Sequence, residues 1–150
     1  SYLLEKKSRV IASAPFGLSE VGRFTRSSDL GIRWKHTAHV SYRRGNWSGM
    51  VIQPYRGGYV DAVLPGVANG TVRPVNWQPK VKPYNIFNFS LTYRGLKNMS
   101  VIAGVKNLFN TAPPFSAAYD TNTGAGSSWE PRVADPRGRS YNLRVEYRFQ

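Results

Sequence analysis

The carboxyl-terminal residues 139–149 alternate between polar and apolar side chains with almost no error. Side chains in an extended strand repeat with period two, so this segment has one apolar face and one charged face. The apolar face holds Tyr141, Leu143, Val145, Tyr147 and Phe149. Aromatic residues at both ends bracket aliphatic ones, the order expected of a strand that crosses a bilayer between two aromatic girdles. About eleven residues at ~3.3 Å each, tilted by ~45°, span roughly 25 Å, the height of an outer-membrane apolar band. A half-buried strand of a soluble sandwich would also alternate.

Composition restricts how this chain could meet a membrane. No run of about eighteen apolar residues occurs, which excludes a transmembrane helix, so a spanning structure would have to be built from β-strands. The chain has no cysteine, and its aromatic content is 13%. The formal net charge of +13 would suit nucleic acid, anionic lipid headgroups or an anionic solute.

The rest of the chain alternates between strand-like segments and connectors. Besides the last strand, the apolar pattern predicts extended segments at Tyr2–Lys6, Ile32–Arg43, Trp47–Tyr59, Tyr84–Tyr93 and Met99–Asn107. The connectors alternate in length. Arg44–Trp47 and Gly95–Asn98 read as tight turns, and Arg9–Leu30, Asp61–Pro79 and Leu108–Gly138 as long loops. Outer-membrane barrels segregate short turns to the periplasmic side and long loops to the outside, and this chain follows that rule.

We therefore expect an all-β fold, an antiparallel up-and-down meander of about six strands that is part of a larger transmembrane β-barrel. Six strands are too few to close, because bacterial single-chain barrels have at least eight and an open sheet in lipid leaves unpaired edge groups. Either several copies assemble or the strands belong to a longer chain. The chain starts Ser1-Tyr2-Leu3 without a methionine or signal peptide, which favours an excerpt of a longer protein.

Several segments resemble the carboxyl-terminal end of TonB-dependent outer-membrane receptors. They are Gly104–Asn110 (GVKNLFN) followed by Ala112–Pro114, then Ala134–Tyr141 (ADPRGRSY) and the closing Tyr147–Phe149. Arg33–His36 and Tyr55–Tyr59 (YRGGY) resemble a neighbouring hairpin of the same family. The similarity runs from about Val21 to Phe149, and the chain departs from the family in ending on Gln150 after the terminal aromatic residue.

The resemblance implies that residues 1–150 are the carboxyl-terminal part of a receptor barrel whose plug domain and earlier strands lie elsewhere. Such a receptor sits in the bacterial outer membrane and imports a scarce solute of the siderophore, cobalamin or carbohydrate class. The implied partners are outer-membrane lipid and lipopolysaccharide, the rest of the barrel and the plug, the barrel-assembly machinery, the solute, and the inner-membrane TonB complex through the amino-terminal part. The lipid-facing row Tyr141, Leu143, Val145, Tyr147 and Phe149 would also carry the insertion signal.

No constellation of catalytic residues is present. The chain lacks a G-x-S-x-G nucleophile motif and paired carboxylates within one element. His36 and His39 fall on opposite faces of a strand and cannot share a metal ion there. Asp120–Gly124 matches only part of a calcium loop, and an Asx-turn explains it better. We expect no enzymatic activity, no catalytic or metal-binding residue and no cofactor.

Two sets of residues are candidates for solute handling. The long loop after residue 114 offers an external ligand surface with Tyr119, Trp129, Arg132 and Arg137. A cationic row facing the lumen is predicted from Arg94, Lys106, Arg144, Glu146 and Arg148. The alternative for the second set is that Arg144, Glu146 and Arg148 pair among themselves and with the plug. Cations near the loop bases, including Lys80 and Lys82, would suit lipopolysaccharide.

The competing function is a soluble basic β-domain that binds nucleic acid or another polyanion. It would need aromatic residues interleaved with arginine and lysine on one exposed face. In the last strand the charges lie opposite the aromatic residues, so we expect no nucleic-acid partner. A third possibility is that this polypeptide by itself is non-functional, because substrate choice and energy coupling need the rest of the receptor.

Overall fold

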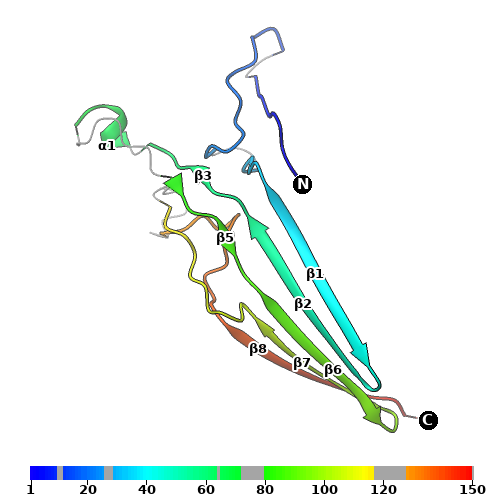
Figure 1. Cartoon of the computed structure of the whole chain (residues 1–150). Coiled ribbons are helices and arrows are strands. Elements are labelled where there is room, and N and C mark those ends of the chain that lie inside the picture. Colours follow the sequence, from blue (N-terminus) through cyan, green and yellow to red (C-terminus); the bar gives the residue numbers. More distant parts are fainter. Residues whose placement is uncertain (10–11, 26–28, 64, 72–79, 117–127, 150) are drawn as a thin grey trace. The chain divides into compact units, whose positions relative to one another are not determined.

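The computed structural model describes residues 1–9, 12–25, 29–63, 65–71, 80–116 and 128–149, which fall into two compact units (Figure 1). One, here called the sheet unit, comprises His36–Tyr55, Asn85–Ala112 and Arg137–Gln150. The other, here called the loop unit, comprises Ser1–Lys35, Arg56–Tyr84 and Pro113–Pro136. No helix in the described part of the chain is long and apolar enough to span a membrane.

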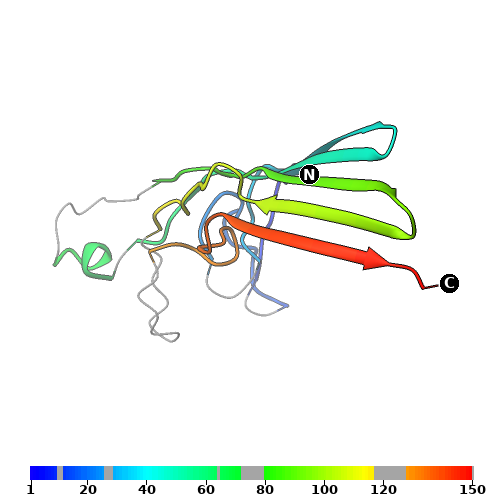
Figure 2. The same ribbon diagram turned by 90° about the horizontal axis from the view of Figure 1, so that it is seen from below.

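The sheet unit is an antiparallel meander. Its strands are β1 (Lys35–Arg44), β2 (Trp47–Arg56), β6 (Asn88–Leu96), β7 (Met99–Lys106) and β8 (Ser140–Tyr147), hydrogen-bonded in that order, as Figure 2 shows. The short strand β5 (Tyr84–Asn85) also pairs with β2, which completes a six-stranded sheet. The all-β, up-and-down fold class predicted from the alternating pattern is confirmed.

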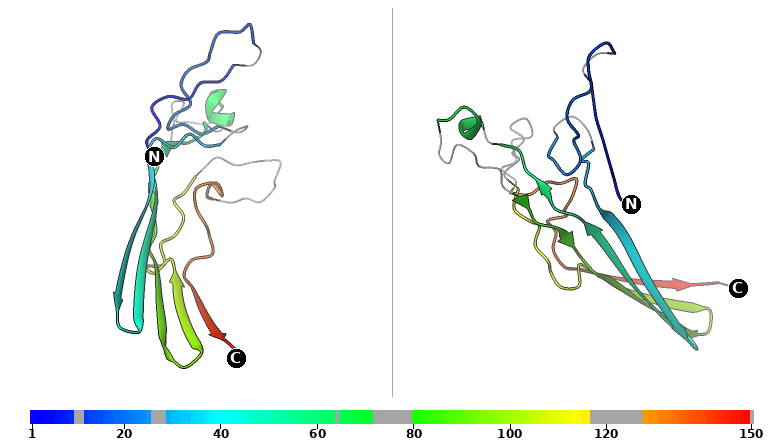
Figure 3. Two further views of the ribbon diagram at one scale, coloured as in Figure 1. Left: turned by 90° about the vertical axis from the view of Figure 1, so that its right-hand side faces the viewer. Right: turned by 45° about the horizontal axis from the view of Figure 1, so that its top comes forward.

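The two tight turns have the backbone conformations that their residues favour. Gly45 in the β1–β2 turn has a φ of +55° and Asn98 in the β6–β7 turn a φ of +57°. Glycine and asparagine tolerate this left-handed region better than other residues. Asn46, which follows Gly45 in the first turn, does not have positive φ. Within the sheet unit both turns lie at the same end as the end of β8, as Figure 3 shows, so the long connectors leave the strands at the opposite end.

The observed strand limits differ from the predicted ones where residues join the loop unit. β1 starts at Lys35 instead of Ile32, because Ile32 is buried in the loop unit. The predicted Trp47–Tyr59 strand breaks at Gly57–Gly58, and Tyr59 starts the separate strand β3 (Tyr59–Val60). Within the described residues, Tyr2–Lys6 contributes one bridge, Tyr2 to Trp34, with a backbone bond of 2.8 Å from Leu3 N to Arg33 O.

The loop unit holds the hydrophobic core, which the sequence did not predict. It contains β3, the short helix α1 (Pro65–Ala68) and β4 (Lys80–Val81), with β3 and β4 paired antiparallel. Among the described residues, all buried hydrophobic side chains belong to this unit. They are Val21, Leu30, Ile32, Tyr59, Val67, Val81, Tyr84, Val133 and Ala134. The segments expected to be plain loops therefore pack around a core of their own.

Candidate functional site

The strand register of the sheet unit collects apolar side chains on one face. Between β2 and β6, Trp47 pairs with Tyr93, Gly49 with Leu91 and Val51 with Phe89. Paired residues on antiparallel strands point to the same face. Strands β6 and β7 continue this face through the pairs Phe89–Val105, Leu91–Ala103 and Tyr93–Val101. Strands β7 and β8 extend it further through Val105–Tyr141, Ala103–Leu143 and Val101–Val145. Four strands thus share one continuous apolar face.

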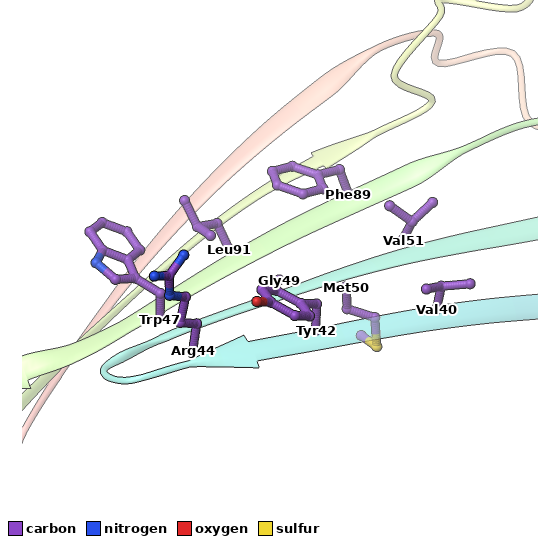
Figure 4. Close-up of a pocket in the computed structure, with 9 residues that line it drawn as sticks. All are labelled: Val40, Tyr42, Arg44, Trp47, Gly49, Met50, Val51, Phe89 and Leu91. Atoms are coloured by element: carbon purple, nitrogen blue, oxygen red, sulfur yellow. The ribbon is translucent and has the colours of Figure 1, made fainter.

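Nothing in the described part of the sheet unit covers this face. Leu143 is 71% exposed and Val145 is 56% exposed. The face also contains an open groove of about 330 Å³, where Gly49 contributes no side chain. Figure 4 shows Phe89 and Leu91 of β6, Val51 of β2, and Val40 and Tyr42 of β1 around this groove, with Trp47 at the turn end. A folded protein in water does not leave a face of this kind uncovered, so an apolar phase or partner is indicated.

Aromatic side chains gather at both ends of the apolar face. At the turn end the rings of Trp47 and Tyr93 have centroids 4.4 Å apart, and those of Tyr147 and Phe149 are 4.9 Å apart. Towards the other end lie Tyr141 and the stacked pair His36 and Tyr55, with ring centroids 4.9 Å apart. Leu91, Ala103 and Leu143 form the row between them. Aromatic residues of this kind suit positions where one end of a side chain is apolar and the other wet.

The opposite face of the sheet is mostly polar, and it holds the residues predicted to face a lumen. Arg144 pairs across the strands with Ile102, Glu146 with Ser100, and Lys106 with Ser140. Arg144 Nη2 lies 2.7 Å from Glu146 Oε1, and the Ser100 hydroxyl donates to Glu146 Oε2 at 3.2 Å. Arg94 and Arg148 line one hollow together with Glu146. The predicted pairing of Arg144 with Glu146 is therefore present, and the lumen role of the set stays a prediction.

Two sequence segments that carry the family resemblance meet at the start of β8. Asn107 is buried. The backbone φ of Asn107 is positive, and so is that of Asn110. The Asn107 side chain accepts from Thr111 N at 2.8 Å and donates to Thr111 O at 2.9 Å. Asn110 Oδ1 then accepts from the backbone N–H of Arg139 at 2.9 Å, next to Gly138 with a φ of +66°. The asparagines of GVKNLFN thus fix the chain where the ADPRGRSY segment enters the last strand.

A polar cluster lies within the loop unit, in which Asp61, Ser116 and Glu130 are buried and Arg132 is exposed. Ser116 Oγ donates to Asp61 Oδ1 at 3.0 Å. Arg132 forms two bonds to Glu130, 2.8 Å from Nε to Oε1 and 3.0 Å from Nη2 to Oε2, and its guanidinium lies 5.3 Å from the centre of the Phe24 ring. The hydrogen bond to Glu130 raises the pKa of Arg132. A bidentate pair beside an aromatic ring holds these segments together.

Tyr59 lies in the same cluster. Burial raises the pKa of Tyr59 to about 12, and its neighbour Ser116 lowers it in part. The Tyr59 hydroxyl has no hydrogen-bond partner of normal geometry among the described residues, although the Ser116 hydroxyl is close enough to influence it. Burial also raises the pKa of Tyr84, whose hydroxyl donates to Asp135 O at 3.2 Å.

The predicted ligand-loop residues are not gathered into one site by the described structure. Tyr119 lies outside the described residues. Trp129 is half-buried and Arg132 is bound to Glu130, both in the loop unit, whereas Arg137 is exposed and belongs to the sheet unit. Arg132 therefore has a structural role, and the proposed ligand contact of all four remains a prediction. Among the described residues no group of three histidine, cysteine or acidic side chains is placed to hold a metal ion.

Sequence reasoning missed a cationic hollow in the loop unit. It has a volume of about 550 Å³, and its lining includes Arg23, Arg33, Lys80 and Lys82. These residues come from three separate stretches of sequence, so no local sequence motif predicts that they lie together. The lysines were noted only as cations near a loop base. Pairing between β3 and β4 brings them together with Arg23.

Comparison with known proteins supports the fold. No protein-family model matches the chain, and no curated protein matches its sequence. Among solved structures it is similar to a mutant of the ferric enterobactin receptor PfeA from Pseudomonas aeruginosa, with 21% sequence identity and a TM-score of 0.54. The match covers 79% of this chain and 16% of the receptor chain, so this chain spans about a sixth of that receptor's length. The chain therefore has a receptor-like β fold.

Proposed function

We propose that this chain is the carboxyl-terminal part of a TonB-dependent receptor barrel in the bacterial outer membrane, which imports a scarce solute. The observation that carries the proposal is the uncovered apolar face that the register of β2, β6, β7 and β8 creates. Aromatic residues at its two ends and polar residues on the opposite face match a barrel wall between lipid and lumen. The fold shared with a ferric enterobactin receptor supports the same function.

The proposed orientation follows from the connectors. Outer-membrane barrels have short turns on the periplasmic side, so we assign the β1–β2 and β6–β7 turns and the end of β8 to the periplasm. The long connectors then belong to the outside, where a receptor meets its solute. Solutes of the siderophore class suit the proposal best, because the structural neighbour is named for a ferric siderophore.

The proposed partners follow from this orientation. The apolar face would contact outer-membrane lipid and lipopolysaccharide, and the polar face would contact a plug. The remaining barrel strands would pair with the edges of the sheet, and the inner-membrane TonB complex would act through the rest of the receptor. The barrel-assembly machinery would insert the strands.

Cysteine labelling of β8 tests the proposal directly, since the chain has no cysteine of its own. We expect Leu143→Cys in the membrane-inserted protein to react with a lipid-soluble maleimide and to resist a charged, water-soluble one. Asn142→Cys, one residue away on the polar face, is the matched control and should react with the water-soluble reagent. Cells expressing the full natural protein should yield it in the outer-membrane fraction, only after detergent extraction.

Two results would refute the membrane assignment. One is recovery of the folded protein in the soluble fraction without detergent. The other is equal reactivity of both cysteines towards the water-soluble reagent. Either result would favour the soluble, polyanion-binding alternative. Uptake of a labelled siderophore that stops when the inner-membrane complex is inactivated would test the transport part.

A further inference from the structure

We infer that the cationic hollow of the loop unit binds a small polyanion through phosphate or carboxylate oxygens. The inference rests on the proposed function and deepens it, because it names the chemical class of ligand that the loop unit of the receptor would bind. The residues that carry it are Arg23, Arg33, Lys80 and Lys82, all of which line the hollow.

Backbone pairing places three of the lining residues side by side. Val60 lies between Arg23 and Lys80, paired with Arg23 in parallel and with Lys80 in the antiparallel β3–β4 ladder. Two backbone hydrogen bonds of 2.8 Å, from Phe24 N to Val60 O and from Val60 N to Gly22 O, hold Arg23 and Val60 in this parallel pairing. Residues directly opposite each other in a sheet share a face. Arg23 and Lys80 therefore flank the apolar side chain of Val60 on one surface, and Lys82 follows two residues after Lys80.

The other surface of the same small sheet is anchored in the core. Tyr59 is 4% exposed and Val81 is 3% exposed. Gly58 allows the backbones to approach closely, since a Cβ there would lie 2.6 Å from Val81 O. A site on rigid elements holds its charges in place without a ligand, which lowers the entropic cost of binding. The YRGGY segment thus supports the floor of the hollow.

The charge of the hollow is uncompensated in the described part of the chain. No aspartate or glutamate is among its lining residues, and no described carboxylate lies within ion-pair distance of the four cations. Arg33 Nη1 contacts the Tyr2 hydroxyl at 3.5 Å, which leaves its positive charge unneutralised. Like charges around one hollow repel one another, and a bound anion relieves this repulsion.

The size and chemistry of the hollow indicate the type of ligand. A volume of about 550 Å³ lies within the range of small-molecule sites. Arginine matches the two oxygens of a carboxylate or phosphate, and lysine adds a point charge. Val21, Val60 and Pro83 supply apolar surface for the body of the ligand. Two sources fit: a dissolved anionic solute, and the phosphorylated headgroup of an outer-leaflet lipid.

The test uses the full natural protein in detergent, with phytate as a soluble polyanion and with vesicles that contain a phosphorylated lipid. The variant is Arg23→Gln combined with Lys80→Gln, both at exposed positions. The matched control is Arg43→Gln with Lys97→Gln, which removes the same charge from two exposed sites of the sheet unit. Loss of each charge-assisted bond should weaken phytate binding by about tenfold, while the phytate affinity of the control variant stays near that of the wild type. Lys82→Gln, outside the β3–β4 ladder, gives a second variant that leaves the pairing intact.

The outcomes separate the possibilities. Weakened phytate binding supports a dissolved solute, and weakened binding to the phosphorylated vesicles alone supports the lipid headgroup as the source of the same chemistry. If the variants and the control bind both probes equally, the hollow is not an anion site and the inference fails. Fractionation reports separately on the proposed function: recovery as a soluble protein would refute the receptor assignment, whatever the phytate result.

Discussion

Single residues in β8 decide between lipid and lumen, and Val145 provides the sharpest test. Val145 lies on the apolar face opposite Val101, whereas Asn142 lies on the polar face opposite Gly104. We predict that Val145→Arg destabilises the folded protein by about 2–4 kcal/mol, the depth-dependent cost of a cation facing lipid. Asn142→Arg should be far milder, since its charge faces polar groups. Denaturant titration in lipid vesicles measures both free energies of unfolding, and equal tolerance at the two sites would contradict the assigned faces.

Tyr59 gives a pH-dependent prediction for the loop unit. Its folded-state pKa is raised from 10 to about 12 by burial. Below pH 10 the phenol is neutral in both the folded and the unfolded chain, so pH has no effect through this residue. Between about pH 10 and pH 12 only the unfolded chain loses the proton, so the folded state loses roughly 2–3 kcal/mol of stability. Tyrosinate absorbance in the near ultraviolet should show Tyr59 among the tyrosines that ionise late, together with Tyr84, whose pKa is also raised by burial.

Substituting Tyr59 by phenylalanine checks the assignment. Tyr59→Phe should remove one late-ionising tyrosine and the part of the alkaline loss of stability that comes from it. Below pH 10 the substitution should cost little, because the hydroxyl has no regular hydrogen-bond partner among the described residues. Tyr141→Phe, at a 72% exposed residue of the sheet unit, serves as the control and should leave the alkaline transition unchanged. Tyr84 should still ionise late in this variant, so an unchanged number of late-ionising tyrosines would show that Tyr59 is not one of them.

At the level of elements, the pairing of β3 with β4 depends on Gly58. A methyl group at this position would lie 2.6 Å from the backbone oxygen of Val81, where neither group can move without breaking the ladder. We predict that Gly58→Ala destabilises the loop unit by about 1–3 kcal/mol, the usual cost of overpacking. Hydrogen exchange of the β3 and β4 amides should speed up, while exchange in β7 and β8 stays the same.

Gly49→Ala is the matched control for Gly58→Ala. The nearest atoms to a Cβ at Gly49 are 3.9 Å away, an ordinary contact distance, on the open apolar face. In the Gly49→Ala variant, the backbone amides at and around residue 49 should exchange at the same rates as in the wild type. If both alanine variants behave alike, the close approach of Gly58 to Val81 is not what holds β3 against β4.

The long strands could be predicted from sequence because their evidence is local. Residues 139–149 carry several repeats of period two, and the same holds for the segments that became β1 and β7. Strands β3 and β4 have only two residues each, too short for any period to appear. The loop-unit core was missed for a related reason: Val21, Val67 and Val133 come from different connectors, and only long-range packing brings such residues together. The cationic hollow depends on those same contacts.

At the level of the whole molecule, the sheet is open. In the sheet order, β1 and β8 lie at the two ends, and each has one long-strand neighbour in the described structure. Unpaired backbone N–H and C=O groups at such edges cost several kcal/mol each in lipid, where water cannot satisfy them. If the apolar face contacts lipid as proposed, both edges must pair with strands outside this sheet. Those strands come either from further copies or from the rest of a longer polypeptide.

The mass of the assembly extracted from native membranes decides between these sources. We predict a single copy of this sequence within a longer polypeptide, because the structural neighbour is a receptor of which this chain matches only 16%. Native mass spectrometry in detergent should then give a mass well above the 16.8 kDa of this chain, with no multiples of it. Exact multiples of 16.8 kDa would instead show that several copies close the barrel. A protease-resistant, membrane-inserted species of one isolated 16.8 kDa chain would contradict the edge argument itself, because a sheet with unpaired edges would then be stable in lipid.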